Sequence, residues 1–134
     1  MAKVRPAVVV SFLLLASGGV GATGQDAVPL FGGLGGLSRK VTTGSPEAQR
    51  YFDQGLAFMY AFNHDEAIRA FRRAGELDPK CAMAFWGVAI ANGPHINNPV
   101  MDEPRARAAW DALQKATALA AHASPAEQAL ITAL

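Results

Sequence analysis

The chain has 134 residues, of which 51% are hydrophobic and 17% are charged, a balance that is typical of one globular domain and excludes a disordered chain. Its 12 basic and 11 acidic side chains nearly cancel, and no basic cluster stands out, which excludes a nucleic-acid-binding surface. The single cysteine excludes an intramolecular disulfide framework and a paired-cysteine metal or redox motif.

The first 22 residues have the layout of a secretory signal peptide. Lys3 and Arg5 precede an apolar run over residues 7–16, and small residues follow as far as Ala22. We therefore predict cleavage after Ala22, a secreted or periplasmic location, and no stable membrane anchor after cleavage. A spanning helix is the weaker alternative, because glycines interrupt the run before it reaches the about 20 apolar residues that a bilayer requires.

Residues 23–44 are predicted to form a glycine-rich linker or a loosely docked arm. The segment 31–37 places glycine pairs between single apolar residues, and such a composition is typical of a flexible connection. Residues 39–43 have the composition of a short extended segment. Of these readings, the flexible linker is the one that the glycine content favours.

Helix start signals recur from Ser45 to the end of the chain. Ser45 and Ser124 are each followed by proline and then by glutamate within three residues, and Asp78 and Asp102 are further start signals. No segment has the alternation of a strand, so the region is predicted to be all-α. The predicted helices are 46–61, 64–77, 81–92, 103–121 and 125 onward.

An internal repeat indicates the fold. The tetratricopeptide pattern places small residues where two antiparallel helices approach each other and large residues in the space between them, over a period of about 34 residues. Gly55 and Ala67 are the small residues here, whereas Gln54 stands where the pattern has leucine. The predicted packing residues of the first repeat are Tyr51, Gly55, Phe58, Ala67, Phe71, Ala74 and Pro79.

Advancing the register by 34 residues maps Tyr51 to Phe85 and Gly55 to Ala89, which predicts a second repeat. The chain then reads as a solenoid of antiparallel helix pairs in which the third repeat stops within its first helix. We expect the isolated fragment to self-associate through the faces that this repeat leaves uncovered. The predicted parts are repeat 1 at 45–80, repeat 2 at 81–121 with an inserted loop at 93–102, and the third repeat at 124–134.

Over residues 45–134 the chain resembles secreted or periplasmic bacterial tetratricopeptide-repeat proteins, and the segments 62–67, 77–84 and 93–99 carry the resemblance. It implies that the chain is the amino-terminal part of a longer solenoid that binds a protein or peptide in a concave groove lined by the first helix of each repeat. The groove positions that it implies are Gln49, Phe52, Leu56, Met59, Met83, Trp86 and Ile90. None is basic, unlike the clamp type that captures acidic carboxyl termini. Either an apolar partner segment fills the groove, or the arm at 29–44 folds back onto it.

Few residues offer chemistry, and we expect neither catalytic residues nor a cofactor. His64 and His95 lie in equivalent turns of the two repeats, which stacking brings to one edge, so a ligand or metal site there is the alternative function. A further alternative is the non-catalytic amino-terminal part of a larger enzyme or assembly factor. Cys81 is interpreted as a small packed residue, with an intermolecular disulfide as the alternative.

Overall fold

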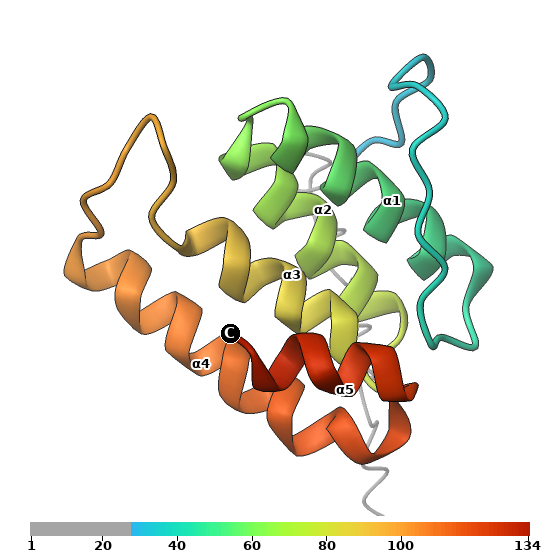
Figure 1. Ribbon diagram of the computed structural model, residues 1–134. Coiled ribbons are helices and arrows are strands. Elements are labelled where there is room, and N and C mark those ends of the chain that lie inside the picture. Colours follow the sequence, from blue (N-terminus) through green and yellow to red (C-terminus); the bar gives the residue numbers. More distant parts are fainter. Residues whose placement is uncertain (1–27) are drawn as a thin grey trace, which may run out of the picture.

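A computed structural model describes residues 28–134, so the predicted signal peptide and its cleavage after Ala22 lie outside the described residues (Figure 1). The described part is all-α, and no strand is found in it. The five predicted helices are present, with ends that differ from the prediction by at most two residues. They are α1 (Pro46–Tyr60), α2 (His64–Leu77), α3 (Ala82–Asn92), α4 (Glu103–Leu119) and α5 (Pro125–Thr132), with a 3-10 turn at Ala120–His122.

Local capping explains where three of the helices begin. The Ser45 side chain accepts a hydrogen bond from the backbone N–H of Ala48, and Asp102 accepts one from the N–H of Arg105. Ser124 forms a reciprocal capping box with Glu127 at the start of α5. Asp78 acts differently from the prediction, because it caps the carboxyl end of α2 and not the start of α3.

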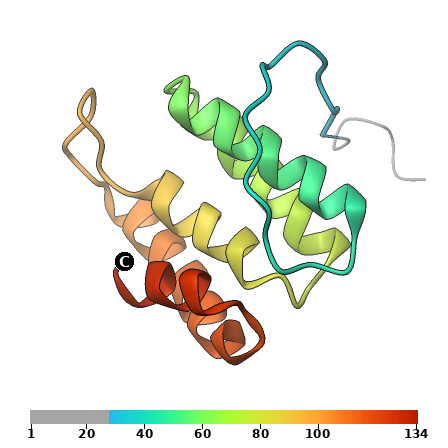
Figure 2. The same ribbon diagram turned by 45° about the vertical axis from the view of Figure 1, so that its right-hand side comes forward.

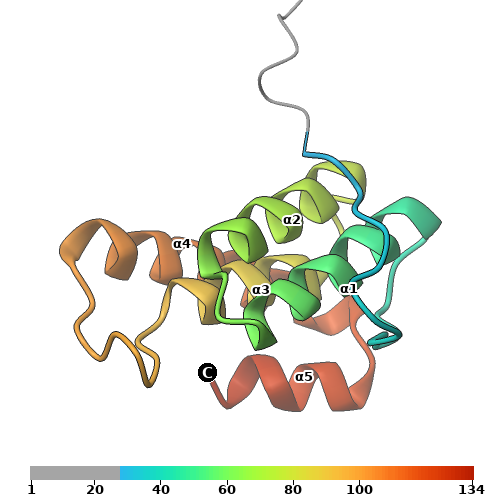
Figure 3. The same ribbon diagram turned by 90° about the horizontal axis from the view of Figure 1, so that it is seen from above.

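The helices pack as two antiparallel pairs, α1 with α2 and α3 with α4, and α2 lies against α3 to join them. Turning the molecule keeps these pairs side by side, and α5 lies beside α3 and α4 (Figures 2 and 3). The architecture is therefore repeat-like and entirely helical. No helix among residues 28–134 has the length and apolar character that a membrane crossing requires.

The centre of the core is the Phe71 ring of α2, which lies between the backbones of Gly55 on α1 and Gly87 on α3. A Cβ atom added at Gly55 would lie 2.5 Å from Phe71 Cε1, and one added at Gly87 would lie 2.5 Å from Phe71 Cδ1. Phe71 is completely buried, and its ring also meets that of Phe52 at a centroid distance of 5.4 Å. Only glycine therefore leaves room for this ring on both sides.

The remaining predicted packing residues differ in their surroundings. Ala67 and Ala74 are completely buried, and Tyr51 is buried beside them in the core. Phe58 is only partly buried and meets the ring of Phe31, outside the helices, in an edge-on contact at 5.7 Å. Pro79 is exposed in the turn between α2 and α3, where it shapes the chain and packs against little.

The prediction of a flexible linker does not describe residues 28–44, which are tied to α1 by polar side chains. The Tyr51 hydroxyl donates to the Val28 carbonyl at 2.7 Å. The Gln54 amide accepts from the Phe31 N–H and donates to the Pro29 carbonyl. The sequence does not reveal these contacts because the partners lie more than 20 residues apart.

The end of the arm is fastened to two further elements. The backbone N–H and the hydroxyl of Thr42 both donate to the Glu127 carboxylate of α5, at 2.7 and 2.5 Å. Thr43 and Gly44 donate to the Asp78 carboxylate between α2 and α3. Residues 41–44 thus connect α1, the α2–α3 turn and α5, and Val41 is buried among them.

We predict that Gly55→Ala and Gly87→Ala each lower the free energy of unfolding by about 1–3 kcal/mol, because the added Cβ overlaps the buried Phe71 ring. Urea denaturation followed by circular dichroism measures the loss. Gly36→Ala is the matched control, since nothing lies within 4 Å of its Cβ position. Wild-type stability in both core variants would contradict the packing of Phe71 described above.

We predict that Glu127→Gln lowers the free energy of unfolding by about 1–3 kcal/mol at neutral pH, because an amide replaces one of the two oxygens that accept hydrogen bonds. Burial alone would raise the pKa of Glu127, but hydrogen bonds from Thr42 and Ser124 outweigh it and hold that pKa below its ordinary value. The contribution is therefore present at neutral pH and is lost as the pH falls through the folded pKa.

Urea denaturation at a series of pH values from about 7 down to about 3 tests this dependence, because the contribution begins to fall near the ordinary glutamate pKa of about 4.3 and is lost towards the lower folded pKa. The difference between wild type and Glu127→Gln should shrink in acid. Glu103→Gln, at an exposed position of α4, serves as the control and should change stability little. A difference that stays constant with pH would count against the ionised Glu127 as the acceptor.

Candidate functional site

The predicted groove is largely filled by the chain itself. Phe52, Leu56, Met83 and Trp86 are buried in the core, so the structure corrects their assignment as partner-contacting residues. The indole N–H of Trp86 donates to the Leu130 carbonyl of α5 at 3.1 Å, which places this ring beneath that helix. The apolar stripes on both sides of α1 and α3 therefore pack within the folded chain.

The other predicted groove residues retain only part of their exposure. Gln49 accepts from the N–H of Val41 and donates to the Arg39 carbonyl, so its amide is engaged by the arm. Met59 and Ile90 are partly buried against the core, near the ends of α1 and α3. Apart from Trp110 on α4, the large exposed apolar side chains lie at or beyond the ends of the helices.

The structure brings His64 and His95 into face-to-face contact. Their ring centroids are 3.9 Å apart and the ring planes differ by 9°. His64 is the first residue of α2, and His95 lies in a tight loop that is closed by two backbone hydrogen bonds between His95 and Asn98. The stack therefore joins the α1–α2 turn to the α3–α4 connection, which belong to consecutive helix pairs.

This stacked geometry does not suit a metal ion shared by the two rings. An imidazole binds a metal through a lone pair in the plane of the ring. Since the planes are nearly parallel and the rings are stacked, an ion in the plane of one ring lies well outside the plane of the other. Within residues 28–134, no group of three or more histidine, cysteine or acidic side chains is placed to hold a metal ion.

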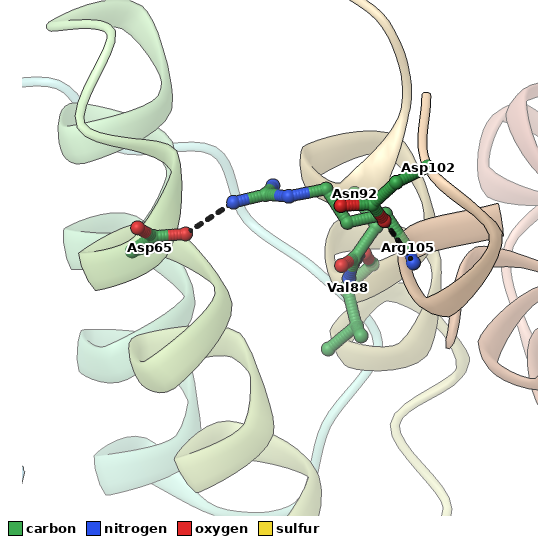
Figure 4. A network of polar contacts seen from close by, with 5 residues as sticks. All are labelled: Asp65, Val88, Asn92, Asp102 and Arg105. Carbon is green, nitrogen blue, oxygen red and sulfur yellow. Dashed lines mark hydrogen bonds and ion pairs between the residues drawn. The ribbon is translucent and has the colours of Figure 1, made fainter. Parts of the chain in front are cut away.

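A polar network fixes the same edge of the molecule (Figure 4). Arg105 of α4 pairs with Asp65 of α2 at 2.6 Å, while its backbone N–H caps the helix through Asp102. The buried amide of Asn92 donates to the Val88 carbonyl and closes the last turn of α3. Because the Asp65 side chain is exposed, the ion pair contributes orientation more than stability.

Five large apolar side chains are exposed at the two connections that the histidine stack joins. Tyr60 is the last residue of α1, Phe62 follows that helix, and the other three lie within residues 96–101 before α4. We call the five the loop-edge patch. Phe62 adopts a φ of 61°, a backbone conformation that residues other than glycine rarely adopt. The centroid of its ring lies 6.3 Å from that of the His64 ring. The members are Tyr60, Phe62, Ile96, Val100 and Met101, with exposed fractions between 37% and 86%.

Sequence reasoning missed the loop-edge patch because it assigned binding to helix faces. The available signal was apolar residues inside a segment rich in asparagine and proline, such as Ile96 within the loop 93–102. A residue of this kind has no helix face to occupy, and its exposure follows from its position in a loop. The five residues supply the large exposed apolar side chains of this edge.

Two adjoining clefts of about 420 and 400 Å³ separate α2 from α4. Phe85 and Val88 line the larger one, whose charged residues, Arg72 and Lys115 with Glu76 and Asp111, balance in sign. Cys81 is completely buried outside both clefts, and burial raises the pKa of its thiol. A thiol in that position cannot reach another chain, so the alternative of an intermolecular disulfide is wrong for this fold.

Comparisons of the chain with known protein families, with curated proteins and with solved structures give no match. The candidate site is therefore defined by geometry: a loop edge held by the histidine stack and by the Asp65–Arg105 pair.

We predict that His95 titrates below the ordinary histidine value of about 6.5. Burial lowers the pKa of His95 most, and the neighbouring His64 and Arg105 lower it further, while its Nδ1 atom is buried without a hydrogen-bond partner. Since the pKa of His95 is lower in the folded than in the unfolded chain, the neutral imidazole contributes to the stability of the fold at higher pH. This contribution is lost as the pH falls through the folded pKa. Acidification should therefore loosen the loop 93–102.

The measurement is an NMR titration of the His95 ring protons in wild type and in His64→Phe. The phenyl ring keeps a stacking partner and removes the charge, so the pKa of His95 should rise but remain below the ordinary value. A wild-type His95 that titrates at or above about 6.5 would contradict the buried stack.

Proposed function

We propose that the protein is a non-catalytic tetratricopeptide-type scaffold that is exported from the cytoplasm and binds a protein partner. Support comes from the two antiparallel helix pairs, from the Gly55–Phe71 contact at the predicted register, and from α5, which begins a third unit. Stacked helix pairs of this kind provide extended surfaces for protein binding. The signal-peptide pattern at residues 1–22 supports export.

We assign partner binding to the loop-edge patch instead of the helical groove. The observation that carries this assignment is the stacking of His64 on His95, because it fixes two connections that both expose apolar side chains. Aromatic residues and methionine are enriched at protein interfaces, and Tyr60, Phe62 and Met101 are of these types. A set of exposed apolar residues held in one arrangement is typical of an interaction site.

The alternative of a metal or ligand site at His64 and His95 is less favoured. The two rings use their faces for each other, and their in-plane lone pairs do not converge on one point. The role that remains for the pair is to position the two connections. No specific observation favours catalysis over binding.

The experiment places a photo-crosslinking amino acid at Phe62, at Ile96, or at the exposed control position Gln114 on α4. We expect one and the same partner to crosslink from both connections in the producing cell and not from position 114. Crosslinking that is equal at all three positions, or different partners from the two connections, would contradict the loop-edge patch as one site.

Once that partner is isolated, Phe62→Ser/Ile96→Ser should weaken its binding about tenfold or more, since each truncation removes an apolar contact at the centre of the interface. The matched control is Trp110→Ser, which removes an exposed aromatic side chain from α4. Circular dichroism should show unchanged helix content in both variants. Wild-type affinity in the double variant would reject the assignment.

A further inference from the structure

A second exposed apolar surface lies on the arm. The loop 31–37 presents Phe31, Leu34 and Leu37, one at every third residue, with exposed fractions of 50%, 37% and 45%. Four glycines separate these residues, and a Cβ atom added at any of them would meet nothing within 4 Å. The loop is drawn in blue in Figure 1, and it borders α1: the Phe31 ring meets Phe58 edge-on, and Leu34 and Leu37 line a hollow beside that helix, while all three side chains keep part of their surface exposed.

The arm is held at both ends of this loop. On one side Gln54 accepts from the Phe31 N–H, and on the other side the Asp53 carboxylate accepts from the Ser38 hydroxyl and the Arg39 N–H. Between the loop and α1 there is a hollow of about 210 Å³ that Arg50 helps to line. The apolar side chains are thus presented by a fixed base and are not the loose end of a chain.

Positive charge surrounds these side chains. Arg39 and Lys40 follow the loop after Ser38, and Arg50 borders the hollow between the loop and α1. No acidic residue occurs between positions 28 and 46. Asp53 of α1 carries one negative charge in this region and accepts hydrogen bonds from neutral donors on both oxygens, so the three cations outnumber it. The loop therefore combines apolar tips with an excess of cations.

We propose that the loop 31–37 is a lipid-contacting loop that seats the protein on an anionic membrane surface. Phe31, Leu34 and Leu37 enter the boundary between headgroups and acyl chains, while Arg39 and Lys40 face the lipid phosphates. This is a reversible peripheral contact and differs from a membrane-spanning anchor. It does not depend on the scaffold function, because it uses different residues.

A lipid surface fits the loop better than a protein surface does. Residues 31–37 have no side-chain hydrogen-bond donor or acceptor. Their four glycines have no side chains that a complementary pocket on a protein could bind. A bilayer interface requires only apolar side chains that reach below the headgroups and cations that attract acidic lipids. Both requirements are met by neighbouring residues of one segment.

The test places an environment-sensitive fluorophore on a single cysteine at Leu34 or, as the control, at Ile96, in the full chain carrying Cys81→Ala. Vesicles contain equal parts of phosphatidylcholine and phosphatidylglycerol, or phosphatidylcholine alone, with or without a lipid-borne quencher. Every variant keeps the same amino-terminal residues, so their contribution is common to all. We expect a blue shift and quenching at position 34 on the anionic vesicles, and neither at position 96.

Two sets of substitutions identify the forces. Phe31→Ser/Leu37→Ser should abolish the quenching at position 34, and Arg39→Gln/Lys40→Gln should lower partitioning onto anionic vesicles by about tenfold or more. The latter change leaves the backbone hydrogen bond from Arg39 to Asp53 intact. Arg107→Gln/Lys115→Gln on α4 removes the same charge elsewhere and should have little effect.

The proposal would be overturned by no spectral change at position 34, by equal quenching at positions 34 and 96, or by equal binding to neutral and anionic vesicles. The first outcome would leave a protein partner as the occupant of the loop, and the second would mean that another segment brings the chain to the bilayer. Undiminished partitioning of Arg39→Gln/Lys40→Gln would also overturn it.

Discussion

The Phe71 ring, held between the backbones of Gly55 and Gly87, sets the spacing of the first three helices. The ring is completely buried, and the two glycines allow the backbones of α1 and α3 to approach it closely. The same close approach fixes how the first helix pair lies on the second. The meeting of His64 with His95 follows from that placement, because the two residues lie on connections at the same edge of the pairs.

The polar side chains of the core serve mainly to attach the arm. Gln54 and Glu127 are both buried, and each directs its polar atoms to the backbone of residues 28–44. A buried polar group without partners would destabilise the fold, so each of these residues requires the arm as much as the arm requires it. The arm thereby becomes part of the folded unit, and it contributes to covering an apolar stripe that α1 would otherwise expose.

Two exposed apolar surfaces remain once the groove is filled. One is the loop-edge patch and the other is the loop 31–37. Apart from Tyr60, the last residue of α1, their residues lie on connections, and Trp110 is a single exposed aromatic side chain on α4. This distribution agrees with a division in which the helices form a rigid support and the connections carry recognition. In the proposed roles, the first surface receives a protein partner and the second rests on a membrane.

The sequence by itself determined the all-α class and the helix boundaries, because those depend on neighbours in the chain. Ser45, Asp102 and Ser124 each cap a helix through a residue three positions ahead, so the signal and its effect lie within one turn. The small residue Gly55 and the large residue Phe71 were likewise recognisable from their spacing.

The site depended on contacts between distant residues, and only the tertiary structure decided it. Thr42 and Glu127 are 85 residues apart, and Gln54 binds residues 23 and 25 positions before it. The one local sign of such a polar partner was that Gln54 stands where the repeat pattern has leucine. An apolar stripe reads the same in sequence whether a partner or the chain itself covers it. The burial of Phe52 against Phe71 and of Trp86 beneath α5 was therefore settled by how the helices pack, because burial is a property of the assembled surfaces and not of the local pattern.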